Sequence, residues 1–195
     1  MITNIIHSIV AIPFVYDAVQ HLAGIDHIRQ RLKPLFAETA GQSVLDVGAG
    51  TGLFLSVFPP SARYIWLDTD PQKLRGFQTR ADRSIPAILG DGTRIGLRDK
   101  SVDYATCTAV THHLTDSQLV ELVSELARVV RKKLFFLDPL DTDAWQSALM
   151  WKYDRGSHPR TAQALTAAIE QQFTIERSES FSIYHRYLLL SANPH

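Results

Sequence analysis

The stretch "SVLDVGAGTG", residues 43–52, decides the fold that we expect for this chain. A short apolar run ends at Asp46 and is followed at once by Gly48, Gly50 and Gly52. An apolar run bounded by glycines is typical of a buried strand that turns sharply into a loop. The glycine spacing is G-x-G-x-G, one residue shorter than the dinucleotide fingerprint, and no G-K-[ST] follows as in a phosphate loop. No lysine or arginine adjoins the loop in sequence, so we expect it to hold something other than a phosphate.

Outward from this loop, short β-branched runs alternate with helical patterns. The runs typical of strands lie at 43–48, 63–68, 85–91, 101–107, 133–138, 173–180 and 184–192. Helical patterns lie at 25–41, 51–58, 71–81, 116–131 (capped by Asp116 or Ser117), 143–156 and 161–173 (capped by Thr161). Strands that alternate with helices form parallel sheets, whereas the last two runs are close enough to pair as a hairpin. We therefore predict an α/β fold: a doubly wound, mostly parallel seven-stranded sheet with a C-terminal antiparallel β-hairpin.

The composition indicates one globular domain, spanning residues 1–195, without a strong charge bias. Lys and Arg number 20, and Asp and Glu also number 20, which argues against a nucleic-acid partner bound through a basic face. Cys107 is the single cysteine, so no disulfide is expected within the chain and a cytoplasmic location is favoured. No Cys/His spacing is typical of zinc, and we expect no metal.

The first 22 residues are apolar but do not read as a signal peptide or a membrane span. They lack an initial basic cluster, and His7 and Pro13 interrupt them. No stretch reaches the roughly 18 apolar residues of a spanning helix, so no integral membrane association is expected. We expect one or two short amphipathic helices that pack on the domain, cover the active site as a lid, or contact a membrane surface. The last alternative is weak because the polar face carries no basic residues.

Acidic residues follow three successive strands of the predicted sheet. Asp46 ends the first, Asp68 ends the second in "YIWLDTDP", and Asp91 follows the third in "ILGDGT". Because parallel strands end at the same side of a sheet, these carboxylates should line one crevice. A negative crevice suits a ligand with positive charge and with hydroxyl or amino donors. Asp70, directly before Pro71, is expected to cap a helix instead.

Four segments in this order resemble the motifs of a known family. "VLDVGAGTG", "LDTDPQKL", "GDGTRIGL" and "SVDYATCTAVTHHL" resemble successive motifs of class I methyltransferases that use S-adenosylmethionine, and the chain looks like a small, UbiE-like core of that family. The resemblance covers about residues 25–140. It divides the domain into an N-terminal segment (1–25), a cofactor-binding half (26–140) and a substrate side with the terminal hairpin (141–195).

The resemblance implies how the cofactor, S-adenosylmethionine, is held. Glycines without a Cβ let the methionyl and ribose parts lie against the backbone. Asp46 would serve the methionyl amine, Asp68 would accept both ribose hydroxyls, and Asp91 with the Gly92 backbone would receive the adenine amino group. The complete cofactor set that we expect is Asp46, Gly48, Ala49, Gly50, Gly52, Asp68, Thr69, Asp91, Gly92 and Thr108.

Histidines and aromatic residues mark the side where an acceptor would bind. His112 and His113 follow the fourth strand, near the transferring methyl group in the family, and are candidates for a catalytic base, with packing before the next helix as the alternative, above all for His113. A base is needed only where the acceptor must lose a proton. An acceptor wall is predicted from Tyr16, Tyr153, His158, Arg160 and His185, with ordinary turn and cap chemistry as the alternative for the segment around His158.

These features predict an S-adenosylmethionine-dependent methyltransferase that acts on O, N or C of a small-molecule or lipid-like acceptor. The absence of large insertions and of a basic track favours such an acceptor over a protein or a long RNA. Two alternatives stay open: a non-catalytic cofactor-binding module of the same fold, and an enzyme of the aminopropyltransferase type. A homodimer is left open as well.

Overall fold

The described part of the chain forms one mixed seven-stranded sheet with helices on both faces. The computed structural model describes residues 13–22, 24–141, 158–184 and 186–195. The strands are β1 (Ser43–Val47), β2 (Arg63–Asp68), β3 (Ala87–Leu89), β4 (Val102–Thr108), β5 (Val130–Pro139), β6 (Phe173–Ser182) and β7 (Arg186–Pro194). Their order is β3-β2-β1-β4-β5-β7-β6. Strands β1 to β5 are parallel, and β7 runs antiparallel to both β5 and β6.

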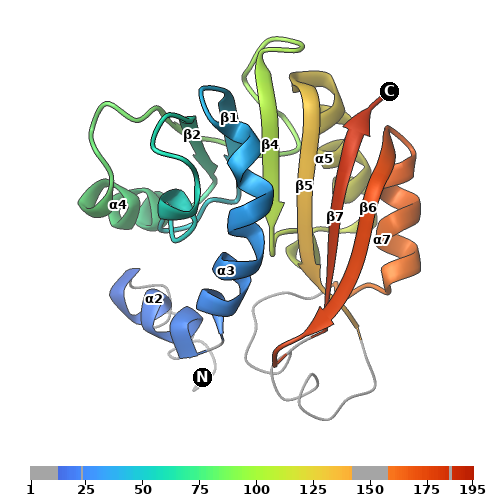
Figure 1. The fold of residues 1–195 in the computed structure, drawn as a ribbon, viewed down its shortest axis with the longest axis horizontal. Helices are drawn as coiled ribbons and strands as arrows, with labels where there is room; N and C mark the ends of the chain where they lie inside the picture. Colours follow the sequence, from blue (N-terminus) through green and yellow to red (C-terminus); the bar gives the residue numbers. More distant parts are fainter. Residues whose placement is uncertain (1–12, 23, 142–157, 185) are drawn as a thin grey trace.

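Helices and short 3₁₀ turns connect these strands. The α-helices are α2 (Pro13–Leu22), α3 (Ile25–Phe36), α4 (Pro71–Arg80), α5 (Asp116–Val129) and α7 (Ala162–Glu170), and the 3₁₀ turns are η1 (Ala37–Thr39), η2 (Leu55–Val57) and η3 (Thr111–His113). In Figure 1, α3 crosses in front of the sheet, whereas α5 and α7 lie behind it. Two hydrophobic clusters fill these layers, one on the α5 and α7 face and one on the α3 face.

The sheet topology places five strand ends on one side. Because β1 to β5 are parallel, their carboxyl ends share one end of the sheet, which we call the carboxyl end. Pro139 of β5 pairs with Tyr187 of β7, so the β6–β7 turn also lies at the carboxyl end. The start of α3 lies there too, since a Cβ built on Gly24 would come within 2.7 Å of Ile183 in that turn.

Most of the predicted architecture is confirmed. All seven strands, the terminal hairpin, the proline at the start of α4 and the Thr161 cap of α7 are present. Cys107 is fully buried in β4, as expected of a small apolar side chain. The helix predicted at 143–156 lies outside the described residues.

Two local predictions are wrong. The segment 51–58 contains only the turn η2, because Gly52 has a left-handed φ of 78° and Pro59 favours an extended residue before it: Phe58 has ψ 150°. Too few residues are left between these two points for a helix. The cap of α5 is Thr115, which forms a capping box with Gln118, and neither Asp116 nor Ser117 takes that place.

Two kinds of special feature are absent from the described residues. No helix among them is both long and apolar enough to cross a membrane. Over the same residues, no group of three or more His, Cys, Asp or Glu side chains is arranged to hold a metal ion.

Candidate active site

The glycine loop after β1 requires glycine for both conformation and space. Gly48 and Gly52 have φ values of 70° and 78°, in the left-handed region that other residues rarely adopt. A Cβ on Gly48 would lie 2.3 Å from Cγ2 of Val110, and one on Gly52 would lie 2.5 Å from Cδ2 of Phe77. The loop thus packs so tightly between the segment after β4 and helix α4 that neither position has space for a side chain. Its backbone is held close to the ends of β1 and β2.

Hydrogen bonds fix this loop to the end of β2. The amides of Gly48 and Ala49 both donate to the Leu67 carbonyl, at 2.9 and 3.1 Å. The Gly50 amide donates to Oδ2 of Asp68 at 2.8 Å, and the Trp66 indole donates to the Gly50 carbonyl at 2.8 Å. The loop is therefore a preformed feature of the fold.

Asp46 is a buried carboxyl group with one described partner. Its side chain is 1% exposed and accepts a hydrogen bond from the Tyr64 hydroxyl. Burial raises the pKa of Asp46 to about 7, the Tyr64 hydrogen bond opposes this rise, and the negative charge of Asp68 adds to it. No cation offsets the charge among these causes. Asp46 is consequently poised to ionise when a positive group comes near.

The other predicted cofactor residues lie along the same end of the sheet. Asp68 is half-buried, and its Oδ1 accepts from the Asp70 amide at 2.9 Å. Asp91 is exposed just beyond β3, where its Oδ1 accepts from the Thr93 amide at 2.8 Å. Both carboxylates keep lone pairs beyond these bonds. Of the remaining predicted residues, Thr69 is exposed beside Asp68, Gly92 adjoins Asp91, and Thr108 is buried at the end of β4. Asp70 caps α4 through the Gln72 amide, as predicted.

Helix α2 is joined to the glycine loop through Asp17. The Thr51 hydroxyl donates to Oδ1 of Asp17 at 2.5 Å, and Arg80 from the end of α4 donates to Oδ2 at 2.5 Å. Arg80 also donates to the Thr51 carbonyl. The Arg80 guanidinium therefore lies next to the loop, although no lysine or arginine adjoins the loop in sequence. Because Asp17 balances its charge, the conclusion that the loop lacks a phosphate partner is unchanged.

His112 is buried against Asp138, the next-to-last residue of β5. The Nδ1 atom of His112 lies 2.7 Å from Oδ1 of Asp138, and the two side chains are 4% and 1% exposed. Oδ2 of Asp138 accepts from the Val110 amide, the Thr111 amide and the Thr111 hydroxyl, at 3.1, 2.7 and 2.8 Å. His113 is exposed, with its ring centroid 4.1 Å from that of His112. Of the two predicted histidines, His112 is the one set in a polar buried site.

Arg160, predicted to contact an acceptor, forms hydrogen bonds to the η3 segment and its surroundings. Its guanidinium donates to the carbonyls of Thr111 and Leu114, both at 2.7 Å, and pairs with Asp116 at 2.7 Å. The side chain is only 9% exposed. The amide of His158 donates to the His112 carbonyl at 3.0 Å. The segment around His158 and Arg160 thus holds the η3 segment in place.

The other predicted acceptor residues are not placed by the structure. Tyr153 and His185 lie outside the described residues. Tyr16 belongs to helix α2, of which only the backbone is described at that position.

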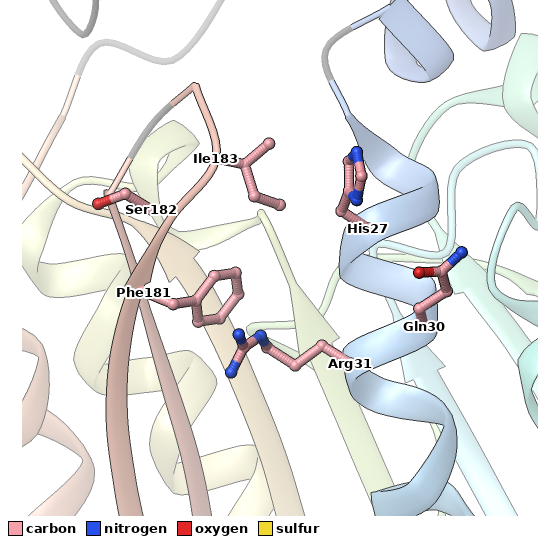
Figure 2. Close-up of a pocket in the computed structure, with 6 residues that line it drawn as sticks. All are labelled: His27, Gln30, Arg31, Phe181, Ser182 and Ile183. Atoms are coloured by element: carbon pink, nitrogen blue, oxygen red, sulfur yellow. The ribbon is translucent and has the colours of Figure 1, made fainter.

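A hollow of about 520 Å³ lies between α3 and the β6–β7 turn. Figure 2 shows Phe181 and Ile183 of the hairpin facing His27 and Arg31 of α3 across it. The Arg31 guanidinium stacks 4.3 Å from the Phe181 ring centroid and pairs with Glu179. This volume is within the range of small-molecule sites, and the hollow adjoins the carboxyl end of the sheet.

Several site residues escaped prediction from the sequence, although one signal was present. Three strands, β1, β2 and β5, each carry Leu-Asp at or near their carboxyl ends, at Asp46, Asp68 and Asp138. The sequence analysis predicts cofactor contacts for the first two, whereas Asp138, which has a similar position in its strand, carries no prediction beyond the end of a strand. The partnerships of Tyr64 with Asp46 and of Asp17 with Arg80 join distant segments and have no such signal.

Comparisons with known sequences agree with this architecture. A sequence profile described as a methyltransferase domain matches residues 45–137. An uncharacterized methyltransferase of Geobacillus sp. is 27% identical over 128 residues, which are 63% of this chain and 60% of that protein. One from Mycobacteroides abscessus is 34% identical over 96 residues, 47% of this chain and 36% of that protein. The match thus spans less than two thirds of these relatives.

Solved structures share the fold across almost the whole chain. The PH0226 protein of Pyrococcus horikoshii has a TM-score of 0.73 at 17% identity, covering 93% of this chain and 92% of its own. Magnesium protoporphyrin IX methyltransferase of Synechocystis, solved with bound S-adenosylhomocysteine, has a TM-score of 0.69 at 17% identity, covering 91% of this chain and 84% of its own. The sequence match and the shared fold show that residues 45–137 are similar to a methyltransferase domain and that the chain has the fold of these structures.

Proposed function

We propose that this protein transfers the methyl group of S-adenosylmethionine to a small-molecule acceptor. The observation that carries the proposal is the arrangement at the carboxyl end of the sheet. There, a tightly packed glycine loop lies beside Asp46 and Asp68, and no cation among the described residues contributes to the pKa of Asp46. A ligand with an ammonium group and a ribose diol matches these groups.

The residues fit the cofactor in chemical type. Asp46 would be the anion for the methionyl ammonium, directly or through water, and the ammonium would restore the ordinary acidity of Asp46. Asp68 would accept the ribose hydroxyls beside its bond from the Gly50 amide. Asp91 with Gly92 would face the adenine, and Thr69 and Thr108 would line the same end of the sheet. When bound, the sulfonium supplies an activated methyl group, and the protein's main contribution is alignment.

The acceptor that we propose is a metabolite-sized molecule. The hollow between α3 and the β6–β7 turn has a volume suited to such a molecule and combines polar and apolar side chains. The equal numbers of acidic and basic residues support an acceptor other than nucleic acid. The finer resemblance to UbiE-like enzymes concerns the choice of acceptor and stays a prediction, as do the cytoplasmic location and a homodimer.

Calorimetric titration with S-adenosylmethionine, followed by an assay for S-adenosylhomocysteine release with hydroxyl and amine acceptors, tests this function. We expect binding that Asp68→Ala weakens, whereas Asp99→Ala keeps it, because Asp99 pairs with Arg128 away from the loop. No binding to the folded protein would contradict the proposal. Binding without turnover would indicate a non-catalytic module, and consumption of the decarboxylated cofactor would indicate aminopropyl transfer.

A further inference from the structure

The hollow between α3 and the β6–β7 turn combines hydrogen-bond donors, a permanent positive charge and apolar side chains. Its described lining residues, none of which is acidic, are His27, Gln30, Arg31, Phe181, Ser182 and Ile183. Figure 2 shows Arg31 reaching from α3 toward the Phe181 ring. His27 lies four residues earlier and therefore on the same face of the helix. The α3 side of the hollow thus offers groups that suit an anion.

The Arg31 guanidinium is paired with Glu179 of β6, but a second guanidinium shares that carboxylate. Glu179 accepts from Arg31 through Oε1 and from Arg177 through Oε2, the latter at 2.7 Å. The carboxylate of Glu176, next to Arg177 in sequence, pairs instead with Lys133 at 2.8 Å. Two guanidinium groups therefore share one carboxylate, and these three side chains keep one net positive charge. One monoanion would neutralise it.

Arg31 retains hydrogen-bonding capacity for such an anion. A guanidinium carries five N–H donors in a planar fork, and the described hydrogen bond to Glu179 uses one of them. The Arg31 side chain is 43% exposed, so a ligand can reach it from solvent. Exposed ion pairs contribute little to stability, so Arg31 can turn from Glu179 toward a ligand at small cost. The fork matches a carboxylate in shape and charge.

Phe181 and Ile183 supply an apolar surface beside this charge. The Arg31 guanidinium carbon lies 4.3 Å from the centroid of the Phe181 ring, and the same ring stacks on Tyr187 of β7 with centroids 5.5 Å apart. These contacts hold the Phe181 ring in one orientation. Phe181 and Ile183 are only half-buried, so both keep surface for a ligand. An apolar group would thus lie next to a carboxylate bound by Arg31.

The hollow also lies close to the end of the sheet that carries the glycine loop. Phe181 pairs with Tyr187, and Tyr187 pairs with Pro139, so the three residues form one row across β6, β7 and β5. Neighbouring strands are about 4.8 Å apart, which places Phe181 roughly 10 Å from the carboxyl end of β5. A molecule held by Arg31 can therefore extend from the hollow toward the proposed cofactor site.

We propose that this hollow binds the acceptor, that the acceptor is a monocarboxylate with an apolar body, and that Arg31 determines this preference. This proposal rests on the proposed function. The carboxylate binds the Arg31 fork, and the apolar body lies against Phe181 and Ile183. The atom that receives the methyl group is at the end of the acceptor away from the carboxylate. Arg31 is a specificity-determining residue and takes no part in the transfer itself.

Titration with 3-phenylpropionate tests the site, with 3-phenylpropanamide as its uncharged match. We expect the carboxylate to bind the protein saturated with S-adenosylhomocysteine at least about tenfold more tightly than the amide does. It should also shift the NMR resonances of the Arg31 Nε–H group and of the Phe181 ring. Equal affinity for the two probes, or displacement of the carboxylate by S-adenosylhomocysteine, would overturn the proposal. Tighter binding of phenyl phosphate would overturn the assignment of a monocarboxylate.

Two variants with opposite expected effects separate an anion site from a structural ion pair. Arg31→Gln removes the fork and should weaken 3-phenylpropionate binding at least about tenfold. Glu179→Gln removes the competing carboxylate and should strengthen that binding about threefold. A structural pair would respond to both changes in the same direction, and this result would overturn the proposal. The matched control is Lys33→Gln, which removes a cation from the exposed surface of α3 outside the hollow and should leave the affinity unchanged.

Calorimetry with S-adenosylmethionine separates this proposal from the proposed function. If the cofactor binds and Arg31→Gln leaves the carboxylate affinity unchanged, the proposal is overturned and the proposed function stands. If the folded protein does not bind the cofactor, the proposed function is overturned, and the acceptor role of the hollow with it.

Turnover of hydroxyl- and amino-substituted phenylpropionates gives a second measurement of the role of Arg31. We expect Arg31→Gln to raise KM at least about tenfold while kcat stays within about threefold, since the contact is made equally in the ground state and the transition state. Faster turnover of the corresponding amides than of the carboxylates would overturn the assignment.

Discussion

The pKa of a buried aspartate is shifted in opposite directions at the two ends of the sheet. At the carboxyl end, Asp46 of β1 is buried beside Tyr64, and its pKa is raised to about 7. At the amino end, Asp103 of the neighbouring strand β4 is also buried, yet its pKa is lowered. Burial alone would raise the pKa of Asp103, but hydrogen bonds from the amide and hydroxyl of Ser43, at 3.0 and 2.8 Å, together with the charges of Lys132 and Arg131, lower it.

The surrounding charges complete this difference. Arg63, Arg131 and Lys132 approach Asp103 within 3.7 to 3.9 Å, so the amino end neutralises its own carboxylate. The causes that set the pKa of Asp46 include no cation. The fold therefore neutralises the carboxylate at the amino end, whereas at the carboxyl end Asp46 can ionise when a cationic ligand binds.

The largest predicted effect concerns the pH dependence of stability through Asp46. Its folded pKa of about 7 exceeds the ordinary aspartate pKa of 3.8, so the folded state retains a proton that the unfolded state releases. Stability from this group is present below about pH 4 and is lost as pH rises toward 7, by roughly 4 kcal/mol at most. Asp46→Asn should flatten this slope in the cofactor-free protein, measured as Tm from pH 4 to 8. A variant whose slope equals that of the wild type would refute the raised pKa.

Cofactor affinity gives the next effect. Asp68→Ala removes the acceptor proposed for the ribose hydroxyls and also a bond from the Gly50 amide. Bonds to a charged group contribute about 1.5–3 kcal/mol each, so the Kd for S-adenosylmethionine should rise at least about tenfold. Calorimetry measures it, with Asp103→Asn as a control in which affinity stays constant because Asp103 lies at the opposite end of the sheet. Equal Kd values for Asp68→Ala and the wild type would exclude the ribose contact.

The amino end should respond in the opposite sense to pH. Because the folded pKa of Asp103 is lowered, its contribution is present above the unfolded pKa and is lost as pH falls through the folded value. Asp103→Asn should therefore lower the free energy of unfolding by about 1–2 kcal/mol at pH 7 and by less at pH 3. Urea unfolding at the two pH values measures this. A loss that is the same at both would show that the charge of Asp103 contributes nothing.

The sequence predicted the parts of the molecule that depend on local pattern. The period of the apolar residues gave the seven strands, and the spacing of Gly48, Gly50 and Gly52 gave the loop. The helix predicted for segment 51–58 is wrong. Phe54, Val57 and Phe58 are buried although the segment consists of turns, and the spacing of these apolar residues is the same as on the buried face of a helix.

The candidate site was predictable only where a single residue follows its own strand. Asp46 and Asp68 could be named in this way. The partner that makes Asp46 unusual is Tyr64, 18 residues away, and the partner of His112 is Asp138, 26 residues away. These contacts arise from strand order, which places β1 beside β2 and β4 beside β5. The contacts of Arg160 with the η3 segment were unpredictable for the same reason, since nothing near Arg160 in sequence shows that it reaches that segment.

The smallest predicted effect is on Tm, and it separates the influence of burial from that of contact distance in two His–Asp pairs. His21–Asp26 and His112–Asp138 share the 2.7 Å Nδ1–carboxylate distance, but the first pair is 45% and 53% exposed. The pKa of Asp26 is lowered by its hydrogen bond from His21 and further by Arg29. Solvent screening and side-chain entropy nevertheless leave such pairs with little net contribution. Asp26→Asn should thus leave Tm unchanged at pH 7, in low and in high salt, whereas Asp138→Asn should lower Tm in both. If the two variants lowered Tm equally, distance and not burial would determine what a His–Asp pair contributes in this protein.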